Sequence, residues 1–183
     1  MLMGFLEFIL SSVLSIFGMV LLIRAWLFVW AFSPRHPLVE VTRRATDWLI
    51  IPLSRFIKRQ GAFDWPSLLS ALVVAYLAVG VHALFIHNPH TPWLWTVAPL
   101  AMMVRWALEM IGWGAFIWVV MSWINPQSPM TYGLGTLLEP FLRPLRRLPL
   151  HFGRFDFSPV LLFLVANILL NFVIPLSMGY RFF

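Results

Sequence analysis

Four long apolar stretches constrain this chain more than any other feature of its sequence. They cover roughly residues 4–30, 67–85, 99–124 and 159–176. Each reaches the about 20 residues that an α-helix needs to cross the hydrocarbon core of a bilayer. With 61% apolar residues, 11% charged residues and a mean hydropathy of +0.85, the chain of 183 residues has more apolar surface than a water-soluble domain can bury. The sequence therefore predicts an all-α membrane protein with four transmembrane helices.

The basic residues are gathered in two of the three connections between these stretches. Most of the 13 Lys and Arg residues lie in residues 35–59 and 143–154, whereas the connection over residues 86–98 has none. Lys and Arg are retained on the cytoplasmic side of a membrane. We therefore expect both basic loops to be cytoplasmic and both chain termini to lie on the outer side.

The two basic loops align with each other at a fixed offset of 92 positions, without a gap. The alignment pairs Pro34 with Pro126, Pro37 with Pro129, Asp47 with Glu139, Pro52 with Pro144, Arg55 with Arg147, Gly61 with Gly153, and Asp64 with Asp156. Self-similarity at one fixed period indicates a duplication. The sequence predicts a tandem parallel repeat of residues 1–92 and 93–183. Each half contains a helix, an amphipathic interfacial helix in a basic loop (about residues 32–66 or 125–158), and a second helix.

Each basic loop has the pattern of a helix that lies in the membrane interface. In the first loop, Val41, Trp48 and Phe56 fall on one helical face, and Arg43 and Arg55 fall on the other. An amphipathic helix of this kind places its apolar face at the acyl boundary and its basic face toward the phosphates. Proline interrupts the helical hydrogen bonds, so we expect each helix to bend or end at Pro52 and Pro144.

The basic side chains of these loops are the candidate binding residues. We assign anionic lipid or a membrane partner to Arg55, Arg143, Arg146 and Arg147. Three interpretations remain open: a topology signal with a surface anchor, a docking surface for another membrane protein, and a specific lipid or anion site. We do not expect nucleic acid as a partner, because neither loop has a recognisable nucleic-acid-binding motif.

Two aspartates follow the basic segments, in the sequences "GAFDWPS" and "GRFDFSP". A carboxylate is favoured at the positive end of a helix, so we expect Asp64 and Asp156 to cap the next membrane span or its lead-in turn. An ion site formed by the two carboxylates is the alternative, although it lacks further oxygen ligands.

A few polar residues fall within the apolar stretches. Arg105 and Glu109 are four positions apart, as are Asn167 and Asn171. Intramembrane charges indicate function by default, but an ion pair or interhelical hydrogen bonds would also account for these residues. Their counterparts at the offset of 92 are apolar, which assigns the intramembrane polar features to the second half alone. Ser11, Ser15 and Gly18 form a stripe of small residues suited to close helix packing or oligomerisation.

The sequence has no pattern that indicates catalysis. It contains no Cys, and the motifs of nucleophilic, phosphate-binding and zinc-dependent enzymes are absent. His82, His87 and His90 lack a matching cluster of metal ligands. We therefore expect no enzyme, no cofactor and no metal site.

The second basic loop resembles the YggT family of bacterial integral membrane proteins, which is related to the YlmG proteins of Gram-positive bacteria and plastids. The matching residues are Pro140, Arg143, Pro144, Leu145, Arg146, Arg147, Pro149, Gly153, Asp156, Phe157, Ser158 and Pro159, with a looser first copy at Pro52, Leu53, Arg55, Gly61 and Asp64. The resemblance implies the bacterial cytoplasmic membrane. In that membrane, the outer side predicted for the termini from the Lys and Arg distribution is the periplasm. It also implies roles linked to osmotic or potassium tolerance, to cell division and, in plastids, to cytochrome assembly and nucleoid organisation. It implies no catalytic or ligand-binding residue.

Two hypotheses of function follow. In the first, the protein is a non-enzymatic membrane scaffold or assembly factor whose basic loops bind an anionic phospholipid surface or an unidentified membrane protein. In the second, it is a small transporter or channel in osmotic adaptation, acting as a homo-oligomer. The residues that would line its path are Arg105, Glu109, Asn167 and Asn171.

Overall fold

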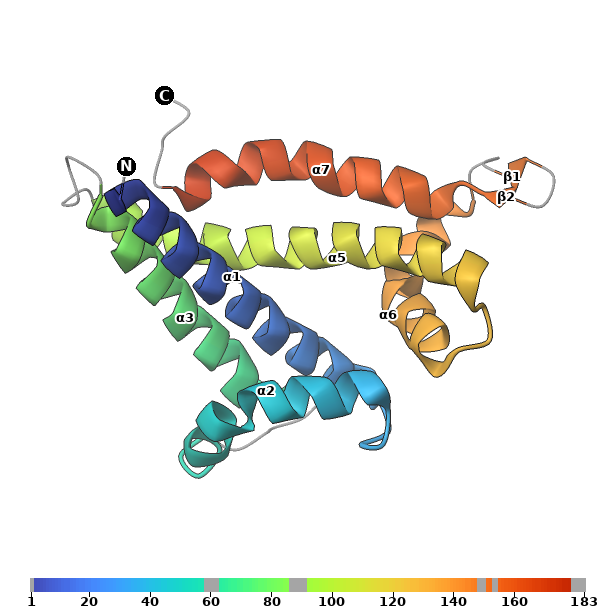
Figure 1. Ribbon diagram of the computed structural model, residues 1–183, viewed down its shortest axis with the longest axis horizontal. Coiled ribbons are helices and arrows are strands. Elements are labelled where there is room, and N and C mark those ends of the chain that lie inside the picture. The colour runs from blue at the N-terminus through green and yellow to red at the C-terminus, as the bar shows by residue number, and fades with distance from the viewer. Residues whose placement is uncertain (1, 58–62, 86–91, 148–150, 153–154, 179–183) are drawn as a thin grey trace.

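The fold is described by a computed structural model that covers residues 2–57, 63–85, 92–147, 151–152 and 155–178 (Figure 1). Four of its helices are long and apolar enough to cross a membrane. They are α1 (Leu2–Val29), α3 (Trp65–Ala83), α5 (Ala98–Ile124) and α7 (Ser158–Ser177). The prediction of a helical, multi-pass membrane protein with four spans is confirmed.

The shorter elements lie in the connections. They are α2 (Pro37–Leu53), α4 (Pro92–Thr96), α6 (Pro129–Leu145), and the antiparallel strands β1 (His151–Phe152) and β2 (Phe155–Asp156). Sequence analysis did not predict this pair of two-residue strands. Two adjacent extended segments satisfy backbone hydrogen bonds that a loop would otherwise leave to water.

The helices α2 and α6 begin and end in similar ways. Each has a proline in its first turn, where the missing N–H costs nothing. The side chains of His36 and Ser128 accept hydrogen bonds from backbone amides of that turn, at 3.3 Å and 3.0 Å. Each helix ends one residue after the proline that was predicted to interrupt it, Pro52 or Pro144. By contrast, α6 continues through Pro140.

The membrane helices form two antiparallel hairpins, α1 with α3 and α5 with α7. The hairpins cross obliquely, with the start of α1 and the end of α7 at one end of the bundle and α2 and α6 at the other (Figure 1). One core cluster joins α1, α3 and α5 around Leu21, Val79 and Trp106. A second joins α5, α6 and α7 around Leu138 and Leu142. Large apolar side chains cover the outer faces of the spans, as expected of surfaces that contact lipid.

Besides the packing of α1 and α3 on α5, the two halves meet at α6, which contacts α1 and the start of α2. The bounds of these helices differ by the same 92 positions that align the two basic loops. Between the halves, the Trp26 indole Nε1 donates to the Leu137 carbonyl at 3.2 Å, and its ring stacks on Phe141 with 5.7 Å between centroids. His36 Nε2 lies 3.1 Å from the Pro129 carbonyl oxygen. The division into two duplicated units at residue 92 stays a prediction from the sequence.

Close approach of α1 to α5 depends on Gly18. The Trp106 ring is fully buried, and a Cβ atom at position 18 would lie only 2.2 Å from it. Gly18 is therefore the part of the predicted small-residue stripe that allows the two hairpins to pack against each other.

We predict that Gly18→Ala destabilises the protein. The new methyl group must displace the buried ring of Trp106, and overpacking of this kind costs about 1–3 kcal/mol. The apparent Tm of the protein in detergent should therefore fall by several degrees. Gly80→Ala is the matched control, because a Cβ there has no neighbour within 4 Å and alanine is the better helix former. Equal melting temperatures for Gly18→Ala and Gly80→Ala would contradict this account of the interface.

Candidate functional site

The helix α2 has three faces rather than the two predicted from its sequence. Its basic residues Arg43 and Arg44 are exposed, and so are the apolar side chains of Val41 and Trp48. A third face, formed by Thr42, Thr46 and Ile50, is buried against the protein. Sequence analysis missed this face, because two of its three residues are polar and do not continue the apolar pattern.

The buried face of α2 binds a charged residue of α1. Arg24 is only 7% exposed and lies roughly 8 Å before the end of α1. Its Nη1 donates to Thr46 Oγ1 at 2.6 Å and to Asp47 Oδ1 at 2.7 Å. Its Nε lies 3.9 Å from Asp64 Oδ2. The same Asp64 oxygen accepts a hydrogen bond from Ser67 Oγ at 2.7 Å, so this Arg24 cluster joins α1, α2 and α3.

Asp64 was predicted to cap the following span. The predicted position is correct, but the predicted capping hydrogen bond is absent. Asp64 occupies the N-cap position of α3, but its side chain makes no capping hydrogen bond to the backbone. Burial beside Arg24 and Ser67 directs the carboxylate to these side chains instead. Asp156 ends β2, one residue before Phe157, the N-cap of α7, and its side chain lies outside the described residues.

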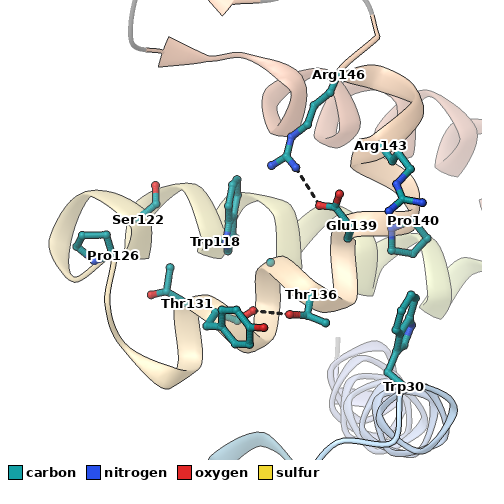
Figure 2. A pocket seen from close by; sticks show the side chains of 12 residues that line it. Trp30, Trp118, Ser122, Pro126, Thr131, Thr136, Glu139, Pro140, Arg143 and Arg146 are labelled. Atoms are coloured by element: carbon teal, nitrogen blue, oxygen red, sulfur yellow. Dashed lines mark hydrogen bonds and ion pairs between the residues drawn. The ribbon is translucent and has the colours of Figure 1, made fainter.

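Two of the predicted arginines, Arg143 on α6 and Arg146 at its C-cap, border a cavity of about 610 Å³ (Figure 2). The cavity lies between the end of α5, α6 and Trp30 of the first half. Arg146 Nη1 donates to Glu139 Oε2 at 2.9 Å, and both side chains line the cavity. Arg143 also lines it and is exposed, without an ion pair to any residue in the described ranges. The other residues that line this cavity are Trp118, Ser122, Pro126, Thr131, Tyr132, Gly135, Thr136 and Pro140.

The other basic residues of the two loops do not line this cavity. Arg55 and Arg147 are exposed, and neither has an ion pair within the part of the chain that the structure describes. Arg44 pairs with Glu40 one turn earlier on α2. Lys58, Arg59 and Arg154 lie outside the described residues. The exposed arginines on this end of the bundle without an ion pair are therefore Arg35, Arg55, Arg143 and Arg147, as far as the described ranges extend.

The structure does not bring the four predicted intramembrane residues together. Arg105 Nε donates to Glu109 Oε1 at 2.8 Å. Asn167 and Asn171 are exposed on α7, and their side-chain amides bond to carbonyls of their own helix at 2.8 Å and 3.2 Å. Arg105 and Glu109 line different cavities, and the cavity that Glu109 lines is mostly apolar. These residues make separate local contacts.

The expectation that polar groups within the spans belong to the second half alone is wrong. In the first half, His82 Nδ1 of α3 lies 2.9 Å from Glu7 Oε1 of α1, and Arg24 is buried near the other end of α1. Sequence analysis missed the pair because its residues are far apart in the chain. His87 and His90 lie outside the described residues.

Comparison with known proteins gives a consistent assignment. The model of the CCB3/YggT family matches residues 3–85 and 97–177. The chain belongs to this family. Its relatives include the protein named YggT of Escherichia coli (strain K12), 34% identical over 169 residues, which are 91% of this chain and 88% of that protein. A protein of Vibrio alginolyticus is 28% identical over 178 residues, 94% of this chain and 96% of that protein. No solved structure matches the chain.

The Arg24 cluster yields a prediction about the stability of this family member. Arg24→Met leaves Asp47 and the almost fully buried Asp64 without their shared cation. Removal of one partner from a buried ion pair typically costs about 3–5 kcal/mol. The apparent Tm in detergent should therefore fall further than in Arg44→Met, which removes only an exposed pair on α2. A fall in Arg24→Met no larger than in Arg44→Met would contradict a structural role for the cluster.

Proposed function

We propose that this CCB3/YggT family member is a non-enzymatic scaffold or assembly factor of the bacterial inner membrane. Its helices α2 and α6 lie in the inner interface and present a basic surface to anionic lipid and to a membrane protein partner. The observation that carries this proposal is the set of exposed arginines without described ion pairs: Arg143 at the cavity of α6, Arg147 just after α6, and Arg55 just after α2.

The exposed apolar residues of the same helices support an interfacial position. On α2, Val41 and Trp48 are 63% and 68% exposed, Phe56 in the turn after α2 is 86% exposed, and on α6 Tyr132 is 75% exposed. Burial of these side chains at the acyl boundary removes apolar surface from water, while the arginines stay at the level of the phosphates. Each basic side chain near an anionic leaflet contributes about 1 kcal/mol to membrane attraction.

The cavity of α6 has the form of a headgroup site within this surface. Arg143 supplies a guanidinium that can donate two parallel hydrogen bonds to a phosphate. Trp30 and Trp118 form apolar walls, and tryptophan is the side chain typical of the membrane interface. Glu139 draws Arg146 away from the ligand, so Arg143 is the residue we assign to direct headgroup contact.

A transporter or channel remains the alternative function. Its predicted lining residues make separate local contacts in one copy of the chain, so a path would require several copies. The scaffold proposal requires only the surface that a single copy already presents. We therefore prefer it, and we treat a homo-oligomer as one of its candidate partners.

The inward orientation of α2 and α6 can be tested by accessibility labelling. The chain contains no native cysteine, so single cysteines report on their own positions. We predict that Tyr132→Cys is protected from a membrane-impermeant maleimide in intact spheroplasts and labelled in inverted vesicles. Gly4→Cys, near the opposite end of the bundle, should show the reverse pattern. Labelling of Tyr132→Cys in spheroplasts would place the basic surface outside and refute the proposal.

Lipid binding can be measured by native mass spectrometry of the full chain in detergent. Wild-type protein should retain phosphatidylglycerol in preference to phosphatidylcholine. The double variant with Arg143→Gln and Arg147→Gln should lose about 30-fold of this preference at low salt, from about 1 kcal/mol per charge. Arg44→Gln is the control, because Glu40 already neutralises that charge locally, and its loss should be smaller. An unchanged preference in the double variant would remove the basis for a basic lipid-binding surface.

A further inference from the structure

A further cavity, of about 370 Å³, lies at the end of the bundle where α1 begins and α7 ends, away from α2 and α6. We name it the terminal cavity. All four membrane helices contribute to its walls: Glu7, Ser11, Ser12 and Ser15 from α1, His82 from α3, Arg105 from α5, and Ser177 from α7. Its apolar walls include Phe8, Ala78 and Met102. Its volume lies within the range typical of small-molecule sites.

The polar groups of the terminal cavity have unused hydrogen-bonding capacity. Elsewhere in the chain, helical hydroxyls bond back to a carbonyl of their own helix, as Ser70 and Ser122 do at 2.7 Å. The hydroxyls of Ser11, Ser12 and Ser15 make no such bond, nor one to any other described residue. These serines are half-buried, so their hydroxyls are open to a ligand or to water in the cavity.

His82 adds a buried nitrogen to the same set. Its Nδ1 lies 2.9 Å from the Glu7 carboxylate, which holds the ring in place. Its Nε2 is buried and has no hydrogen-bond partner among the described residues. A carboxylate only accepts hydrogen bonds, so Nδ1 carries the proton, and Nε2 of a neutral ring is left as an acceptor. This acceptor points to a ligand that brings a donor.

The charges of the cavity have both signs. Glu7 and His82 place acceptors on α1 and α3, while Arg105 places a cation on α5. The Nε of Arg105 is used by Glu109, which lies outside this cavity, and its two Nη nitrogens have no described partner. A lone cation bound here would be repelled by Arg105, and a lone anion would be repelled by Glu7. A ligand that carries both a negative and a positive group can pair with Arg105 and with Glu7.

We propose that the terminal cavity binds a small zwitterionic group, with its anion on Arg105 and its ammonium between Glu7 and His82. The serines of α1 supply hydrogen bonds along its length. This chemistry occurs in a free amino-acid-like solute and in the headgroup of a zwitterionic phospholipid such as phosphatidylethanolamine. The site is independent of the basic surface at the opposite end of the bundle.

The test uses the full chain in detergent, with separate probes for the two sources. Soluble phosphoethanolamine and glycine are added in thermal-shift assays, and retention of phosphatidylethanolamine over phosphatidylcholine is measured by native mass spectrometry. Stabilisation by either soluble probe assigns the site to a free solute. Retention of phosphatidylethanolamine without that stabilisation assigns it to a lipid headgroup. The absence of both effects would mean that the cavity holds only water, and would overturn the proposal.

Variants then tie the effect to the cavity. The double change Ser11→Ala and Ser15→Ala leaves the Arg105–Glu109 ion pair and the His82–Glu7 hydrogen bond intact and should weaken binding about tenfold, from the loss of two hydrogen bonds. Glu7→Gln removes the partner of the ammonium and should weaken it further. Ser70→Ala, on α3 and bonded to the Pro66 carbonyl of its own helix, is the matched control because it lines neither proposed site, and it should bind as wild type does. Equal binding by the serine double variant and the control would place the ligand elsewhere and refute the assignment.

Discussion

Charged side chains inside a bilayer need partners, and this requirement determines how the first half of the chain is held together. An unpaired guanidinium in hydrocarbon is costly, and a buried ion pair is stable only with good geometry and further hydrogen bonds. Arg24 obtains both from Thr46 and Asp47 of α2 and from Asp64 at the start of α3. The same contacts that satisfy the Arg24 guanidinium therefore fix α2 to the hairpin of α1 and α3.

In the second half, α6 is held by a different interaction from the one that holds α2. At the offset of 92, Phe116 stands in place of Arg24, and Leu138 and Leu142 stand in place of Thr46 and Ile50. These leucines are buried in the core between α5, α6 and α7. Because apolar packing holds α6, its carboxylate Glu139 has no buried arginine to neutralise and pairs instead with Arg146 at the cavity. The halves therefore differ where lipid or a partner is proposed to bind, although their helices have matching bounds.

Local patterns in the sequence were sufficient to predict the four spans and the presence of helices α2 and α6 in the connections. Apolar length set the four spans to within a few residues, and Pro52 and Pro144 marked the ends of α2 and α6. The pairing of polar groups was not predictable in this way. Thr46 faces inward because of an arginine 22 positions away, and His82 has its partner 75 positions away. Periodicity reports the surroundings of a helix face only when that face is uniformly apolar or charged.

The arrangement of the polar sites along α1 distinguishes binding from conduction. Ser11 and Ser15 face the terminal cavity at one end, and Arg24 lies near the other. Between them, Gly18 is in close contact with the Trp106 ring, and Leu21 is completely buried. Passage of a solute along this face of α1 would require α1 and α5 to separate at this contact, which would open the core between the two hairpins. Two separate sites at opposite ends of the bundle require no such opening, so the packing favours a protein that binds ligands at each membrane face over one that conducts between them.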